Sequence, residues 1–117
     1  MKIALDAMGG DQAPDVTIGG ARNALAAYPS IERLFLVGDE SRLREGCREK
    51  KLNDSRLEII HAPEVVGMSE SAVGAIRRKK TSSISVATEM VKEGQADAVV
   101  SAGNTGAAVA ACTLKLR

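Results

Sequence analysis

The sequence is poor in aromatic side chains, with one phenylalanine, one tyrosine and no tryptophan in 117 residues. Proteins that bind single-stranded nucleic acid usually stack the bases on exposed aromatic rings. The formal net charge is only +1, so no overall attraction to nucleic acid or to an anionic membrane surface is expected. The composition therefore argues against a nucleic-acid-binding protein.

Metal-binding and redox residues are also scarce. The single histidine, His61, has no cysteine or acidic cluster beside it, so a metal site is not predicted. The two cysteines, Cys47 and Cys112, form no CxxC motif, and we expect core residues in a reduced, cytoplasmic protein. The absence of a Gly-x-Gly-x-x-Gly fingerprint and of a Walker A motif argues against dinucleotide and ordinary ATP binding.

Membrane-targeting signals are lacking as well. The longest uncharged run, residues 98–114, is too polar and glycine-rich for a membrane span. Asp6 and Asp11 interrupt the N-terminus, which argues against a secretory signal. The last apolar run stops without a helix cap, and we expect the sequence to be part of a longer chain.

Buried apolar runs alternate with amphipathic segments along the chain. Strands are predicted over residues 2–7, 31–37, 56–61 and 98–101. Helices are predicted from Pro14 to Tyr28, from Asp39 to about Lys51, and from Ser82 or Ser83 to Gly94, with residues 62–83 the least regular. This order predicts an α/β fold with a parallel sheet and right-handed crossovers.

The expected inner faces of the helices follow a helical repeat. These residues are Ile18, Ala21, Leu25, Leu43, Cys47, Ile84, Ala87 and Val91. Gly19 and Gly20 interrupt the first helix at a cost of about 1 kcal/mol each relative to alanine. We expect a close approach of that helix to another backbone to explain them.

The most informative stretch is residues 98–106, where an apolar strand stops at Ser101 and a helix of small apolar residues follows. Gly103 and Gly106 permit a tight turn, and Asn104 or Thr105 can cap the helix. The first amides of a helix attract anions. The pattern therefore predicts a phosphate-sized anion site, although an ordinary glycine-rich turn explains the spacing equally well.

A second loop, residues 8–14, follows the first strand and contains Gly9, Gly10 and Asp11. Open parallel sheets bind ligands at the carboxyl ends of their strands, so both loops are expected at one edge. Asp11 either orients a nucleophile or a substrate, or simply caps a turn.

The densest charge cluster is Arg77, Arg78, Lys79 and Lys80. Such a run is either the solvated end of a helix, a docking surface for an acidic partner, or a phosphate clamp.

Taken together, three motifs resemble the amino-terminal part of the bacterial phosphate acyltransferase (PlsX) family. They are IALDAMGGD at 3–11, AIRRKKTSS at 75–83 and AVVSAGNTG at 98–106. The resemblance covers essentially the whole chain. It departs at Gln12, where family members often carry histidine, and we interpret Gln12 as a loop residue.

The resemblance implies a three-layer α/β/α sandwich with a mainly parallel sheet, similar to isopropylmalate dehydrogenases and phosphotransacetylases. Residues 1–117 would form the N-terminal portion of one acyltransferase domain. The implied reaction transfers a fatty acyl group from acyl carrier protein to inorganic phosphate, for phospholipid synthesis. The family also implies a cytoplasmic homodimer that can associate peripherally with the membrane, without metal, nucleotide cofactor or nucleic acid.

The site residues are assigned on that basis. Gly103, Asn104, Thr105 and Gly106 would bind phosphate and stabilise the oxyanion, with Gly9 and Gly10 as the opposing wall. Asn104 and Asp11 are the predicted catalytic residues, and Arg77, Arg78, Lys79 and Lys80 would dock the acidic carrier. No side chain is a convincing covalent nucleophile, so direct attack by phosphate is preferred. The alternatives are a phosphotransacetylase-like enzyme acting on acyl-CoA and a non-catalytic module that binds an acidic protein or nucleic acid through residues 77–80.

Overall fold

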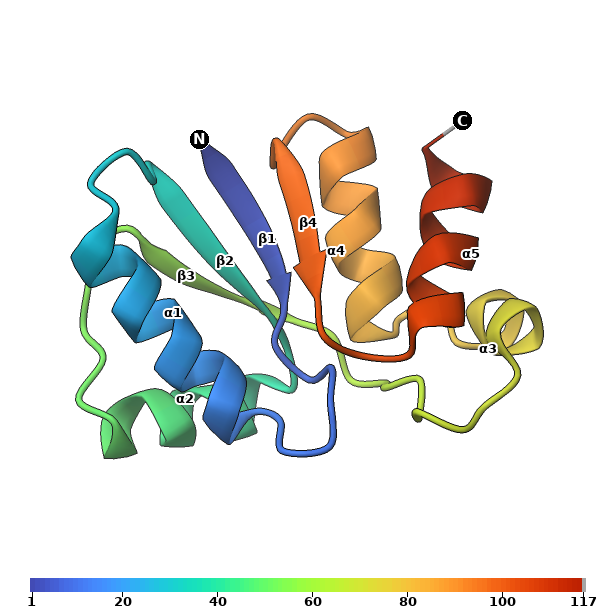
Figure 1. Cartoon of the computed structure of the whole chain (residues 1–117), viewed down its shortest axis with the longest axis horizontal. Coiled ribbons are helices and arrows are strands. Elements are labelled where there is room, and N and C mark those ends of the chain that lie inside the picture. The colour runs from blue at the N-terminus through green and yellow to red at the C-terminus, as the bar shows by residue number, and fades with distance from the viewer. Residues whose placement is uncertain (117) are drawn as a thin grey trace.

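Four strands form one parallel sheet in the computed structural model, which describes residues 1–116. The strands are β1 (Lys2–Asp6), β2 (Arg33–Gly38), β3 (Leu57–His61) and β4 (Ala98–Ser101). Their spatial order is β3-β2-β1-β4, and each neighbouring pair is parallel (Figure 1). The prediction of an α/β fold with a parallel sheet is confirmed.

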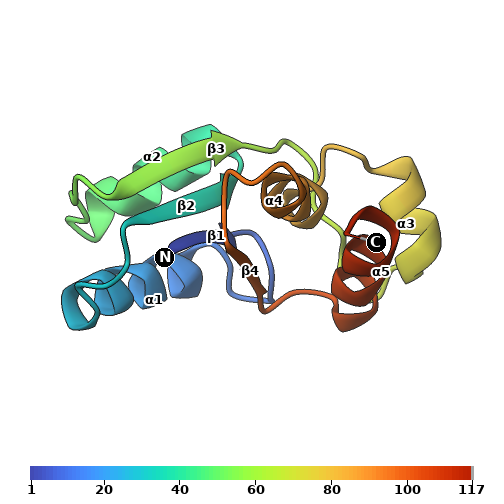
Figure 2. The same ribbon diagram turned by 90° about the horizontal axis from the view of Figure 1, so that it is seen from above.

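Helices cover both faces of this sheet. They are α1 (Asp15–Ala27), α2 (Glu40–Glu49), α3 (Ala72–Arg78), α4 (Ser83–Lys92) and α5 (Thr105–Lys115). Figure 2 shows α1 and α2 on one face and α4 on the other, with α5 beside α4 and α3 beside α5. The arrangement is an α/β/α sandwich, as expected.

The alternation of side chains along the central strands divides the core into two layers. On β2, Leu34 and Leu36 pack with α1 and α2, whereas Phe35 and Val37 pack toward α4. Both sets are buried because a parallel sheet with helices on each side has no solvent-facing surface at its centre.

The ends of the helices follow the predicted signals. Asp39 and Ser82 cap α2 and α4 by accepting backbone amides, and Tyr28 follows the last residue of α1. Gly94 has a φ of +79° just after α4, a conformation that glycine adopts without strain. The predicted boundaries are therefore confirmed to within a few residues.

One detail of the sequence-based prediction was wrong. A Cβ atom on Gly20 would have no heavy-atom neighbour within 4 Å, and one on Gly19 would meet only the Lys50 side chain, so neither supports a close backbone approach. The inner face of α4 includes Val91, as predicted, which is half-buried and packs against the core together with buried Met90.

The short helix α3 was not predicted, because it lies in the segment that seemed irregular. Its seven residues are too few to show a helical repeat. Ala75 and Ile76 are buried against Ala107 and Ala110 of α5, so tertiary packing stabilises this helix.

Candidate functional site

The carboxyl ends of β1 and β4 lie side by side, with Asp6 paired to Ser101 at the end of the ladder. The chain leaves β1 toward α1 on one face of the sheet and leaves β4 toward α5 on the other (Figure 1). This is a topological switch point, the place where open α/β sheets bind ligands. The prediction that both glycine-containing loops lie at one edge is confirmed.

The two loops touch through their glycines. A Cβ atom on Gly9 would lie 2.8 Å from the backbone nitrogen of Gly103, closer than real Cβ contacts allow. Gly10, the next residue, has a φ of +99°, which favours glycine. Gly9 is buried and donates its amide to the Asp6 carbonyl at 3.3 Å. Gly9 is therefore needed for the close approach of the loops.

A buried carboxylate lies beneath this contact. Asp6 is 3% exposed, and its Oδ2 accepts a hydrogen bond of 2.8 Å from the Ser101 hydroxyl. Ser101 Oγ also accepts the Gly103 amide at 3.1 Å. The second oxygen, Asp6 Oδ1, is buried without a hydrogen-bond partner among residues 1–116. Because buried polar atoms are nearly always paired, this open acceptor distinguishes the junction of β1 and β4 from the rest of the core.

The loop after β1 is anchored to α1 on its far side. The Thr17 hydroxyl donates to the carbonyls of Ala7 at 2.5 Å and Pro14 at 2.9 Å. Asp11 is exposed between these anchors, and the structure gives its carboxylate no hydrogen bond within residues 1–116. Its catalytic role remains a prediction.

The turn that leads into α5, residues 103–106, is called the anion turn from here on. Asn104 is the N-cap, with Oδ1 accepting the Ala107 amide at 3.0 Å and its carbonyl accepting the Ala108 amide at 3.0 Å. The amides of Thr105 and Gly106 have no acceptor within residues 1–116, and both residues are exposed. Free, outward amides at a helix N-terminus are suited to an oxyanion.

The side-chain amide nitrogen of Asn104 is hydrogen-bonded to a segment earlier in the chain. Its Nδ2 donates to the carbonyls of Gly67 at 2.9 Å, Met68 at 3.2 Å and Glu70 at 3.0 Å. Both ends of this side chain are therefore occupied within the protein. Asn104 connects α5 to a segment more than thirty residues earlier.

That segment, residues 64–71, is called the clamped loop. Lys79 Nζ donates to the Val65 carbonyl at 2.9 Å and to Glu70 Oε1 at 2.5 Å. Two hydrogen bonds lower the pKa of the Glu70 carboxyl group. The one from Lys79 has the larger effect, and the one from the Gly67 amide adds to it. A carboxyl group with a lowered pKa contributes stability above its ordinary pKa and loses it as the pH falls through the lowered value. The clamp is thus intact at neutral pH.

The basic run therefore divides into two parts. Arg77, Arg78 and Lys80 are exposed, whereas Lys79 is half-buried in the ion pair with Glu70. Sequence reasoning missed Glu70 because a lone acidic residue in an irregular segment gives no signal. Only the three-dimensional contacts connect it with Lys79 and Asn104.

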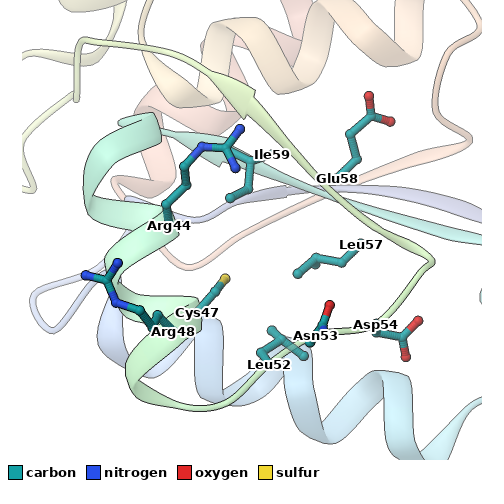
Figure 3. A pocket seen from close by; sticks show the side chains of 9 residues that line it. All are labelled: Arg44, Cys47, Arg48, Leu52, Asn53, Asp54, Leu57, Glu58 and Ile59. Atoms are coloured by element: carbon teal, nitrogen blue, oxygen red, sulfur yellow. The ribbon is translucent and has the colours of Figure 1, made fainter.

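A separate hollow lies at the opposite edge of the sheet, between α2 and β3 (Figure 3). It has a volume of about 560 Å³ and includes Arg44 and Arg48. Both cations already pair with glutamates of α2, Glu40 and Glu45. Burial raises the pKa of the Cys47 thiol in its wall, so that thiol is a neutral core group, as expected. Cys112 is half-buried on α5.

Among residues 1–116, no group of at least three His, Cys, Asp or Glu side chains is arranged to hold a metal ion. Within that range, none of the helices combines the length and apolarity needed to cross a bilayer. His61 accepts the Glu40 amide through Nδ1 at 3.1 Å, a structural role at the start of α2.

The family model described as "Fatty acid synthesis protein" matches residues 1–117. The chain belongs to this family. It is 57% identical to the phosphate acyltransferase of Akkermansia muciniphila over 117 residues, which are all of this chain and 34% of that protein. It is 54% identical over 114 residues to the phosphate acyltransferase of Desulforamulus reducens, covering 94% of this chain and 32% of that protein.

A third relative matches the chain over a similar range. The phosphate acyltransferase of an Exiguobacterium species is 48% identical over 112 residues, which are 95% of this chain and 33% of that protein. The chain thus spans about a third of the length of these family members. The resemblance to phosphate acyltransferases inferred from the three motifs is confirmed.

The glycine contact between the loops can be tested by adding one methyl group. We expect Gly9→Ala to reduce the free energy of unfolding by about 1–3 kcal/mol, because the Cβ would press on the Gly103 backbone. Gly20→Ala is the control, since its methyl group would enter open space on α1 and should stabilise by up to about 1 kcal/mol. Denaturant unfolding of the complete protein measures both. Equal effects of the two changes would contradict the close contact.

The double role of Asn104 can be separated with a substitution that preserves the cap. Asn104→Asp keeps an N-cap oxygen but aims a carboxylate at three carbonyls, and should cost about 1–3 kcal/mol at neutral pH. Asp39→Asn, a cap exchange without such contacts, should cost less than about 1 kcal/mol. The cost of Asn104→Asp should shrink below about pH 4, where the new carboxyl group becomes protonated and can donate. A cost that does not vary with pH would refute this explanation.

Proposed function

We propose that the complete protein transfers a fatty acyl group from acyl carrier protein to inorganic phosphate, forming an acyl phosphate for phospholipid synthesis. The observation that carries the proposal is the anion turn at the switch point, with the open amides of Thr105 and Gly106. The relatives are phosphate acyltransferases and the family is one of fatty acid synthesis proteins, which supports an enzyme of this chemistry.

The reaction needs a phosphate oxygen held beside a thioester carbonyl. In our proposal an oxygen of hydrogen phosphate attacks the carbonyl carbon, a C–O bond forms and the C–S bond breaks. The proton of hydrogen phosphate passes to the leaving thiolate, so the products are an acyl phosphate and a free thiol. Positioning accounts for much of the rate of such a step, and backbone amides can stabilise the developing oxyanion.

Direct attack by phosphate is favoured over a covalent intermediate on Ser101, the serine nearest to the anion turn in sequence. Ser101 Oγ donates to Asp6 and accepts from Gly103, so its hydrogen bonds join the ends of β1 and β4 to the anion turn. Attack by this oxygen on a substrate would break both contacts, whereas phosphate is itself a nucleophile and needs no activated side chain. We therefore assign Ser101 a structural role.

The predicted site residues take different parts in this proposal. Thr105 and Gly106 bind phosphate through their amides, while Gly103 shapes the anion turn against Gly9 and Gly10 of the opposing wall. Asn104 acts by holding the first turn of α5 in place, since its side chain is fully occupied. Asp11 remains the proposed polar group of the exposed loop, near enough in sequence to the wall to orient a substrate.

The exposed cations of α3 and the following turn are proposed to dock the acidic carrier protein. Arg77, Arg78 and Lys80 form this docking patch, on a helix that packs beside α5 (Figure 1). Complementary charge accelerates association and selects partners. From the family we also propose a cytoplasmic homodimer that can associate peripherally with a membrane.

The proposed activity is tested by incubating the complete protein with an acyl thioester of acyl carrier protein, with phosphate and without it. We expect thiol release and a new acyl phosphate signal in the ³¹P NMR spectrum only with phosphate, because phosphate is the nucleophile. Sulfate in place of phosphate is the control for ionic strength. A preference for acyl-CoA would favour the phosphotransacetylase-like alternative, and no thioester consumption would favour a binding module.

The docking patch is tested by replacing Arg77, Arg78 and Lys80 with serine while Lys79 is kept. The KM for the acyl carrier thioester should rise about tenfold at low salt, since each exposed ion pair contributes roughly 0.2–1 kcal/mol. The salt dependence of that KM should flatten. A control that replaces the exposed cations Arg42, Lys51 and Lys92 removes the same charge far from α3. Identical behaviour of both triple variants would show that the patch is only a solvated surface.

A further inference from the structure

We propose that Lys79 is a positioning residue for phosphate binding, acting on the anion turn through the clamped loop and Asn104. The inference rests on the proposed function, because it assumes that phosphate binds at the anion turn. It separates Lys79 from the three neighbouring cations, with which the sequence alone had grouped it.

The first step connects Lys79 with the clamped loop. Its ammonium group bonds the Val65 carbonyl at 2.9 Å and Glu70 Oε1 at 2.5 Å, thereby closing the loop at two points. Glu70 Oε1 in turn accepts the Gly67 amide at 3.2 Å. Both side chains are partly withdrawn from water, with exposures of 28% for Lys79 and 31% for Glu70. An ion pair in this setting is less screened than one on the open surface.

The second step connects the clamped loop with the anion turn. The carbonyls of Gly67, Met68 and Glu70 converge on Nδ2 of Asn104. This convergence holds the asparagine so that its Oδ1 caps the amide of Ala107. The cap satisfies the third amide of α5 and leaves those of Thr105 and Gly106 pointing outward.

Electrostatic interactions also predict that loss of the Lys79 ammonium group weakens phosphate binding. Three carbonyl dipoles aimed toward one end of the anion turn would repel a bound anion if they were left unpaired. The two N–H groups of Asn104 Nδ2 are within hydrogen-bond distance of all three carbonyls, and the Lys79 ammonium group bonds the same loop. Removal of the ammonium group would release the loop, loosen the asparagine and weaken phosphate binding. The chemical step would be less affected, because Lys79 does not contact the anion turn itself.

A matched pair of variants tests the inference in the complete protein. Lys79→Met keeps the aliphatic stem and removes the charge, while Lys79→Arg can still reach both acceptors. The control is Lys115→Met, which breaks a comparable ion pair with Glu89 between α4 and α5. Its side chains are 24% and 39% exposed, and the Nζ–Oε2 distance is 3.4 Å. Lys115 makes no hydrogen bond to the clamped loop.

The readouts are KM for phosphate, kcat, KM for the acyl carrier, and hydrogen exchange of residues 64–71 and 104–108. For Lys79→Met we expect the KM for phosphate to rise on the order of tenfold with kcat changed less than about threefold, as for a loss of positioning. Exchange should accelerate in both segments. Lys79→Arg should restore the KM for phosphate, and Lys115→Met should leave both it and exchange in the clamped loop unchanged.

Two results would overturn the inference. The first is an unchanged KM for phosphate with a raised KM for the carrier, which would return Lys79 to the docking patch. The second is an equal rise in the KM for phosphate for Lys79→Met and Lys115→Met, which would indicate a general loss of stability. If the unaltered protein shows no phosphate dependence at all, the proposed function fails. In that case, hydrogen exchange of residues 64–71 and 104–108 still shows whether Lys79 controls the anion turn.

Discussion

The approach of two backbones at Gly9 and Gly103 is the constraint on which the candidate site depends. The β1–β4 ladder ends at the pair Asp6 and Ser101, and the hydrogen bond of 2.8 Å between their side chains joins the strand ends. Beyond this pair the chains diverge to opposite faces of the sheet, so only glycines allow the loops to remain in contact. The positions of both loops, and with them the start of α5, follow from this junction.

The site combines opposing electrostatic contributions. The α5 N-terminus attracts an anion, whereas the buried Asp6 carboxylate and the carbonyls of the clamped loop repel one. The repulsive groups are largely paired, by Ser101 beneath the turn and by Asn104 beside it. A network of this kind stabilises one geometry only while each member keeps its partner. Residues that never touch the ligand can therefore control its affinity.

Local signals predicted most of the fold. Apolar runs located the four strands, and capping residues such as Asp39 and Ser82 located helix starts, because these signals act within a few residues. The juxtaposition of the two glycine loops followed from parallel topology alone. The helix α3 and the pairing of Lys79 with Glu70 could not be predicted, since both depend on packing between segments far apart in the sequence. For the same reason, Lys79 could not be distinguished in the sequence from the three exposed cations beside it.

The central claim is that phosphate binds at the anion turn, and an NMR titration of the complete protein, labelled with ¹⁵N-glycine and ¹⁵N-threonine, tests it most directly. We expect saturable shifts of the Thr105 and Gly106 amides on addition of phosphate, with smaller shifts at Gly9 and Gly103. Gly46 of α2, which faces Ile18 of α1, should not move. Saturable shifts at Gly46 with no change at Thr105 and Gly106 would contradict the account.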